Sequence, residues 1–195
     1  MKGAEASDRA SSAVFTVPNL LSFARILLIP VFVLLIVHHP TTTAGVVMFG
    51  AVVATDWVDG WVARRTGQVS ELGKILDPTA DRLAIASGLI ALVVRGAFPL
   101  WAALLILVRD AAILAAGAFL LAGRRIRIEV RFIGKSATFA LMCAIPWIAW
   151  GTLGLPLAEA ALVGGWTAFA IGIVESYVAA GAYVGDLRRS RTAGA

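Results

Sequence analysis

Four aspartates lie close together in a chain that is otherwise strongly apolar. Asp56 and Asp59 are three positions apart, and Asp77 and Asp81 are four positions apart. On an α-helix, these spacings bring the two members of each pair onto one face. Uncompensated carboxylates in apolar surroundings would be very costly in free energy. Because clusters of oxygen ligands bind hard divalent cations, the residues predict a metal site.

The composition indicates a membrane protein. The chain has 195 residues, of which 59% are hydrophobic and 15% are charged, and such a composition is too apolar for a soluble domain. The net charge of +5 does not indicate nucleic-acid binding, because the basic residues flank hydrophobic runs instead of forming a stripe interleaved with aromatics. The single cysteine, Cys143, excludes an intrachain disulfide.

The hydrophobic runs predict the elements that must position the aspartates. Irregular backbone cannot face lipid, so each run is expected to be a helix. We expect an all-α integral membrane protein in which a polar arm, 1–16, and a basic tail, 188–195, flank one domain, 17–187. Its six transmembrane helices are expected at 17–37, 44–64, 77–94, 100–122, 136–153 and 157–187. The first run has no small-residue cleavage site and is expected to be retained.

The basic residues predict the orientation of these helices. Fifteen of the seventeen lysines and arginines lie on the arm, the tail, the connections of one side or the helix ends next to them. Positive charge gathers on the cytoplasmic side of a membrane, so both termini and the aspartates are expected to face the cytoplasm. We therefore expect the protein in the cell membrane, which in bacteria with two membranes is the inner one. Transporters also use intramembrane acids, but near the bilayer midplane and often within repeats, which this sequence lacks.

The aspartates belong to a longer pattern, D-x2-D-G-x2-A-R-x8-G-x3-D-x3-D, which runs from Asp56 to Asp81 with every fixed position present. The pattern resembles the signature of the CDP-alcohol phosphatidyltransferases. The resemblance implies transfer of a phosphatidyl group from CDP-diacylglycerol to an alcohol, with two Mg²⁺ or Mn²⁺ ions and a homodimeric protein. It implies that Asp56, Asp59 and Asp77 are metal ligands. Asp81 would contribute to the second metal and act as the general base.

The same resemblance implies the residues that contact CDP-diacylglycerol. Those in or near the signature are Gly60, Arg64, Ser70 and Gly73. Gly73 could instead be only a turn residue before the third helix.

Near the N-terminus, Asn19, Ser22 and Arg25 form an N-x2-[ST]-x2-R segment. It resembles the family branch that makes phosphatidylglycerophosphate or cardiolipin, and it would line the nucleotide pocket. The alternative is that Asn19 and Ser22 cap the helix and that Arg25 snorkels.

The acceptor alcohol is the open part of the prediction. We expect glycerol 3-phosphate, with phosphatidylglycerol as the alternative. Arg109, Arg131 and Lys135 are the basic residues expected to bind the acceptor. Arg109 could instead form a structural ion pair with Asp110, and the basic segment 124–135 could simply attract anionic lipid headgroups. For Glu175 and Tyr177 we expect only an interhelical hydrogen bond.

Overall fold

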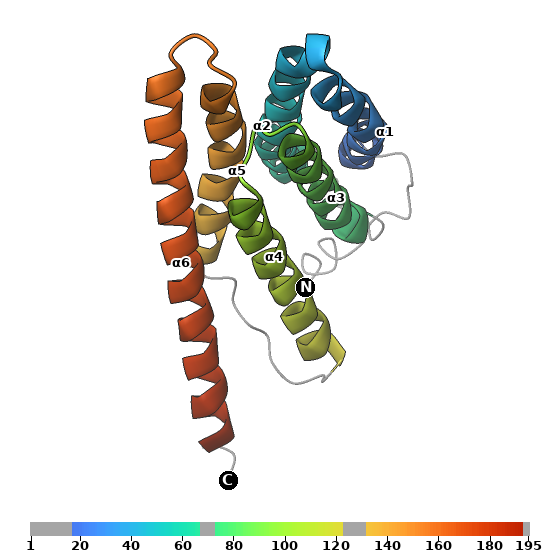
Figure 1. Cartoon of the computed structure of the whole chain (residues 1–195). Coiled ribbons are helices and arrows are strands. Elements are labelled where there is room, and N and C mark those ends of the chain that lie inside the picture. The colour runs from blue at the N-terminus through green and yellow to red at the C-terminus, as the bar shows by residue number, and fades with distance from the viewer. Residues whose placement is uncertain (1–16, 67–72, 123–131, 193–195) are drawn as a thin grey trace. The chain divides into compact units, whose positions relative to one another are not determined.

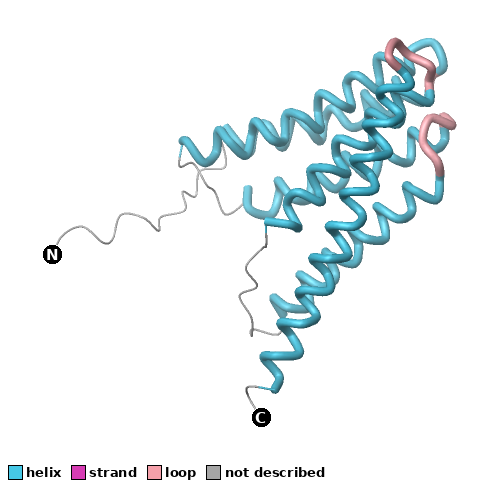
Figure 2. Tube along the Cα trace, turned by 90° about the vertical axis from the view of Figure 1, so that its left-hand side faces the viewer, coloured by secondary structure: helices cyan, strands magenta, loops and turns pink. Residues whose placement is uncertain are grey.

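The computed structural model describes residues 17–66, 73–122 and 132–192, and in these ranges it contains helices and no strand (Figures 1 and 2). The helices are α1 (Val17–Val37), the short 3-10 helix η1 (His39–Thr41), α2 (Thr42–Thr66), α3 (Gly73–Val94), α4 (Leu100–Ala122), α5 (Phe132–Thr152) and α6 (Ala158–Thr192). The all-α prediction is therefore confirmed for the described residues. The chain divides into two compact units, of which the first ends at Ala91, within α3.

The helix bounds agree closely with those predicted from hydrophobicity. α1 and α4 have the predicted bounds, whereas α3 begins four residues earlier, at Gly73. Gly73, Asp77 and Asp81 thus all lie within the described helix. α6 continues to Thr192 and so extends into the basic segment that begins at residue 188.

The first unit is built around aromatic and aliphatic side chains from α1, α2 and α3. The rings of Phe32 and Phe49 pack with their centroids 5.4 Å apart, and both side chains are fully buried. A Cβ atom added at Gly88 would lie 2.2 Å from Cε2 of Phe49, so α3 passes directly over the Phe49 ring. This contact fixes α3 against α2.

The outer face of α1 is apolar. Leu20, Leu27 and Leu34 are spaced by seven residues, and they are 64%, 72% and 70% exposed. The seven-residue spacing places them on one stripe of the helix. Large apolar stripes of this kind are not left in contact with water. The stripe is consistent with a surface that faces lipid.

The second unit contains a close helix pair, α5 and α6. Cβ atoms added at Gly165 and Gly172 would lie 2.9 Å from the Ile148 nitrogen and 3.0 Å from the Ala137 oxygen, respectively. Only glycine allows backbones to approach so closely, which is a common way for helices to pack in membranes. Trp101, on α4, stacks on Trp166 of α6 with ring centroids 5.5 Å apart.

The length and hydropathy of the helices support one membrane span directly. Among the described residues, Ala158–Ala179 of α6 is long and apolar enough to cross a bilayer alone. Ser22–Val37 and His39–Thr55 meet the same test only together, as a pair bent by 110°. The structure is thus consistent with a membrane protein, while six spans and their orientation stay predictions.

Candidate active site

The aspartates of the sequence pattern lie on two consecutive helices. Asp56 and Asp59 are in the second half of α2, and Asp77 and Asp81 are in the first half of α3. Six residues, 67–72, connect the two helices, and α3 runs back antiparallel to α2 (Figure 1). Both pairs thus lie on helical backbone, where their spacings place the two members of each pair on one face.

The contact between Phe49 and Gly88 sets the levels of the two helices. Asp56 follows Phe49 by seven residues on α2, and Asp81 precedes Gly88 by seven residues on α3. At a rise of about 1.5 Å per residue, both aspartates lie about 10 Å along the helices from that contact. Their backbones are therefore at the same level. By the same measure, Asp77 is level with Gly60, the residue that follows Asp59.

Asp81 is the aspartate of the pattern whose side chain the structure describes. It is 20% exposed and forms an ion pair with Arg25 of α1 through its Oδ1 atom. Arg25 is only 6% exposed, so it does not snorkel to the surface. Asn19 and Ser22 lie inside α1, which already includes Val17, so neither is its N-cap.

Several predicted site residues are not among the residues or side chains that the structure describes. Ser70 and Arg131 fall outside the described residues. A further group lies on described helices, but the structure does not describe the surroundings of these residues. They are Asn19, Asp56, Asp59, Gly60, Arg64, Gly73, Asp77 and Lys135. Among the described side chains, no group of three His, Cys, Asp or Glu residues forms a metal cluster.

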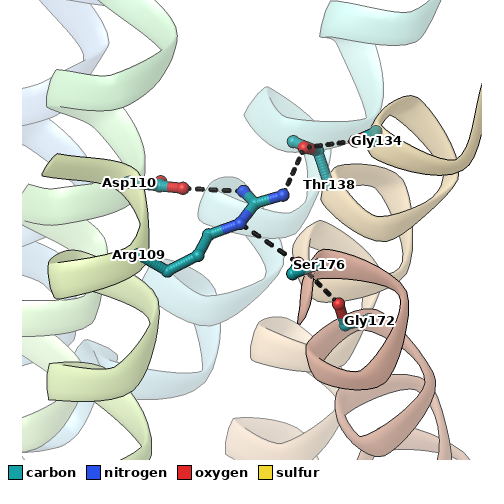
Figure 3. A network of polar contacts seen from close by, with 6 residues as sticks. All are labelled: Arg109, Asp110, Gly134, Thr138, Gly172 and Ser176. Carbon is teal, nitrogen blue, oxygen red and sulfur yellow. Dashed lines mark hydrogen bonds and ion pairs between the residues drawn. The ribbon is translucent and has the colours of Figure 1, made fainter. Parts of the chain in front are cut away.

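A second polar network lies in the other unit, around Arg109 of α4 (Figure 3). Its Nη1 atom is 2.7 Å from Oδ1 of Asp110. Its Nε donates to Ser176 on α6 at 3.2 Å, and its Nη2 donates to Thr138 on α5 at 3.1 Å. The ion pair offered as an alternative role for Arg109 is thus formed. The two hydroxyl partners, 29 and 67 residues away, could not be found from local spacing.

The hydroxyl groups that hold Arg109 are themselves fixed. Thr138 donates to the Gly134 carbonyl at 3.1 Å, and Ser176 donates to the Gly172 carbonyl at 2.7 Å. Each hydroxyl therefore donates to its own helix and accepts from the guanidinium, a satisfied arrangement in an apolar environment. The network ties α4, α5 and α6 together.

Two further polar residues on α6 were expected to form an interhelical hydrogen bond. Oε2 of Glu175 is buried and has no hydrogen-bond partner among the described residues. Tyr177 is 68% exposed. The expected bond is therefore not made by that oxygen within the described part of the chain.

These features define a helical, membrane-compatible protein with a paired-aspartate site on two adjacent helices. Residues 15–174 match the family described as CDP-alcohol phosphatidyltransferase. The chain belongs to this family, as its aspartate pattern indicated.

Named relatives agree with this assignment. The chain is 37% identical to "Cardiolipin synthase (CMP-forming)" of Streptomyces coelicolor over 90% of its own length and 84% of the relative. It is 33% identical to "CDP-diacylglycerol--glycerol-3-phosphate 3-phosphatidyltransferase" of Bacillus subtilis, over 68% of this chain and 75% of the relative. The enzyme of the same name from Escherichia coli K12 is 35% identical over 70% and 78%.

Proposed function

We propose that this protein transfers the phosphatidyl group of CDP-diacylglycerol to a glycerol-based alcohol, releasing CMP. The observation that carries the proposal is the level arrangement of the paired aspartates on α2 and α3, set by the packing of Gly88 on Phe49. The relatives act on CDP-diacylglycerol or form CMP according to their names. Two pairs of aspartates on adjacent helices, within about one helical turn of each other along the helices, are a donor set that fits hard divalent cations.

Asp56, Asp59, Asp77 and Asp81 would hold two Mg²⁺ or Mn²⁺ ions, which would offset the negative charge of the substrate diphosphate. Asp81 would accept the proton of the acceptor hydroxyl. The oxygen of that hydroxyl then forms a bond to the lipid-linked phosphorus, and the bond from this phosphorus to CMP breaks. Positioning by the helices matters more than basicity, because a carboxylate near a cation is a weak base.

The nucleotide would lie along the same helices. Gly60 has no Cβ and would let the CDP group approach α2 closely, and Arg64 would bind a phosphate. Ser70, Gly73, Asn19 and Ser22 complete the proposed pocket by family resemblance.

We further propose six membrane spans with both termini and the active site on the cytoplasmic side, in a homodimer. The exposed leucine stripe of α1 and the apolar segment Ala158–Ala179 support the membrane location. The asymmetric distribution of lysine and arginine supports the orientation.

Thiol labelling tests this orientation in a Cys143→Ala background. His39, in the turn between α1 and α2, and Glu159, at the start of α6, are both exposed. His39→Cys and Glu159→Cys are expected to react with an impermeant thiol reagent in intact cells. Ser70→Cys is expected to react only after the membrane is permeabilised. Thr42, in the same turn as His39, is a poor probe because it is 4% exposed and donates to the Ile36 carbonyl. Labelling of Ser70→Cys from outside would reverse the orientation.

Two acceptors remain as candidates. The cardiolipin synthase relative covers more of the chain than the glycerol-3-phosphate enzymes do, which favours phosphatidylglycerol. Glycerol 3-phosphate, the acceptor expected from the sequence, is supported by the Bacillus and Escherichia relatives. Arg109 is already paired with Asp110, so Arg131 and Lys135 are the residues that we propose for binding the acceptor's phosphate.

An assay with purified protein separates these acceptors. CDP-diacylglycerol and Mg²⁺ are supplied with glycerol 3-phosphate or phosphatidylglycerol, and CMP and lipid product are measured. We expect cardiolipin from phosphatidylglycerol. If glycerol 3-phosphate is used instead, Lys135→Ala should raise its KM about 10- to 100-fold, since one charged hydrogen bond is lost. No product with either acceptor would contradict the proposed function.

A further inference from the structure

Arg25 occupies an inward position on a membrane-compatible helix. It shares the buried face of α1 with Phe32 and Ile36, which are fully buried, and its own side chain is 6% exposed. The opposite face carries the exposed leucines. A long basic side chain in such a helix usually extends to the membrane surface. Arg25 instead points inward, and a buried guanidinium requires an anion close by.

That anion is Asp81, which lies 56 residues further along the chain, on α3. The contact joins a guanidinium nitrogen of Arg25 to Oδ1 of Asp81, an atom with almost no solvent exposure. A carboxylate is planar, so holding one oxygen also fixes the direction of the other.

We propose that Arg25 is a positioning residue for Asp81. It holds the Asp81 carboxylate through Oδ1, which orients the group for its work in phosphatidyl transfer. This inference rests on the proposed function and changes the role that the sequence suggested for Arg25. Contact with the nucleotide was expected, whereas the structure joins the N-x2-[ST]-x2-R segment of α1 to the last aspartate of the family pattern.

The planar guanidinium explains why arginine is suited to this position. Its donors have a fixed geometry that matches a carboxylate, whereas a lysine ammonium is a rotatable point charge. If only the positive charge of Arg25 mattered, Arg25→Lys would be a mild change. A positioning role makes it a damaging one, because a misplacement of about 1 Å in a catalytic group can cost about 100-fold in rate.

Steady-state kinetics of purified Arg25→Lys and Arg25→Gln test the role. For both variants we expect kcat to fall about 100-fold, with the KM for CDP-diacylglycerol nearly unchanged. Arg95→Gln, which removes an arginine from the turn between α3 and α4, is the matched control and should retain wild-type kinetics. A raised KM for CDP-diacylglycerol with an unchanged kcat would make Arg25 a nucleotide contact and overturn the proposal. Wild-type kcat in Arg25→Lys would overturn it as well.

Thermal unfolding in a chelator, without substrate, tests the contact independently of activity. Arg25→Gln and Asp81→Asn each remove one side of this buried ion pair and should each lower Tm by about 5–10 °C. The double variant removes both partners and should lose clearly less than the sum of the two shifts. Additive shifts would show that the two side chains do not interact. If wild type lacked phosphatidyl transfer, the proposed function would fail, whereas this coupling would still report on the contact.

Discussion

Asp77→Asn is expected to lower turnover about 100- to 1,000-fold while the protein remains folded. The substitution keeps the size of the side chain and removes its charge, so a residue proposed to hold the metal ions would be weakened without a packing defect. Effects of this size are typical when a group that stabilises transition-state charge is removed. CMP release at saturating Mg²⁺ measures turnover, and gel filtration with thermal unfolding measures folding.

Metal content distinguishes this explanation from a general loss of activity. In the presence of CDP, wild type should bind two Mn²⁺ ions per chain, and Asp77→Asn should bind fewer. Asp8→Asn removes the same charge outside residues 15–174, the range that matches the family, and should behave as wild type. Wild-type turnover in Asp77→Asn at saturating Mg²⁺ would rule out the proposed metal site.

Gly88→Ala is expected to reduce turnover about 100-fold, although Gly88 lies two helical turns from the nearest aspartate of the pattern. The added Cβ would lie 2.2 Å from Cε2 of Phe49. The Phe49 ring is fully buried against Phe32 and has little room to move. α3 must therefore shift against α2, at a cost of about 1–3 kcal/mol. The shift displaces Asp77 and Asp81 relative to Asp56 and Asp59, and small displacements of catalytic groups are costly in rate.

A compensating substitution tests this account of Gly88. Phe49→Leu removes the ring atoms that the new Cβ would meet, so Gly88→Ala combined with Phe49→Leu should recover most of the lost turnover. Phe49→Leu alone should retain substantial turnover and lose about 1 kcal/mol of stability. If the double variant is no more active than Gly88→Ala, the packing of α3 on α2 does not set the aspartate levels.

The sequence predicted the helices well because their signal is local. Runs of apolar residues set the bounds of α1 and α4, and the spacing of Asp56, Asp59, Asp77 and Asp81 showed that each pair shares a face. The start of α3 was placed four residues late because Gly73 also fits a turn.

Contacts between distant residues could not be predicted from local patterns. The pairing of Arg25 with Asp81 depends on how α1 packs on α3, and the hydroxyls that hold Arg109 come from two other helices. Hydroxyl residues within apolar helices are a weak signal for such contacts, since many bond only to their own helix. Thr167, for example, donates to the Val163 carbonyl at 2.7 Å.

CMP release by purified wild-type protein is the most direct test of metal-dependent phosphatidyl transfer at the four aspartates. The protein is stripped with a chelator and supplied with CDP-diacylglycerol and both acceptors, before and after Mg²⁺ or Mn²⁺ is added. We expect no CMP before the addition, and afterwards CMP and phosphatidyl product in equal amounts. Transfer that continues in the chelator, or CMP formed without a phosphatidyl product when both acceptors are present, would contradict the account.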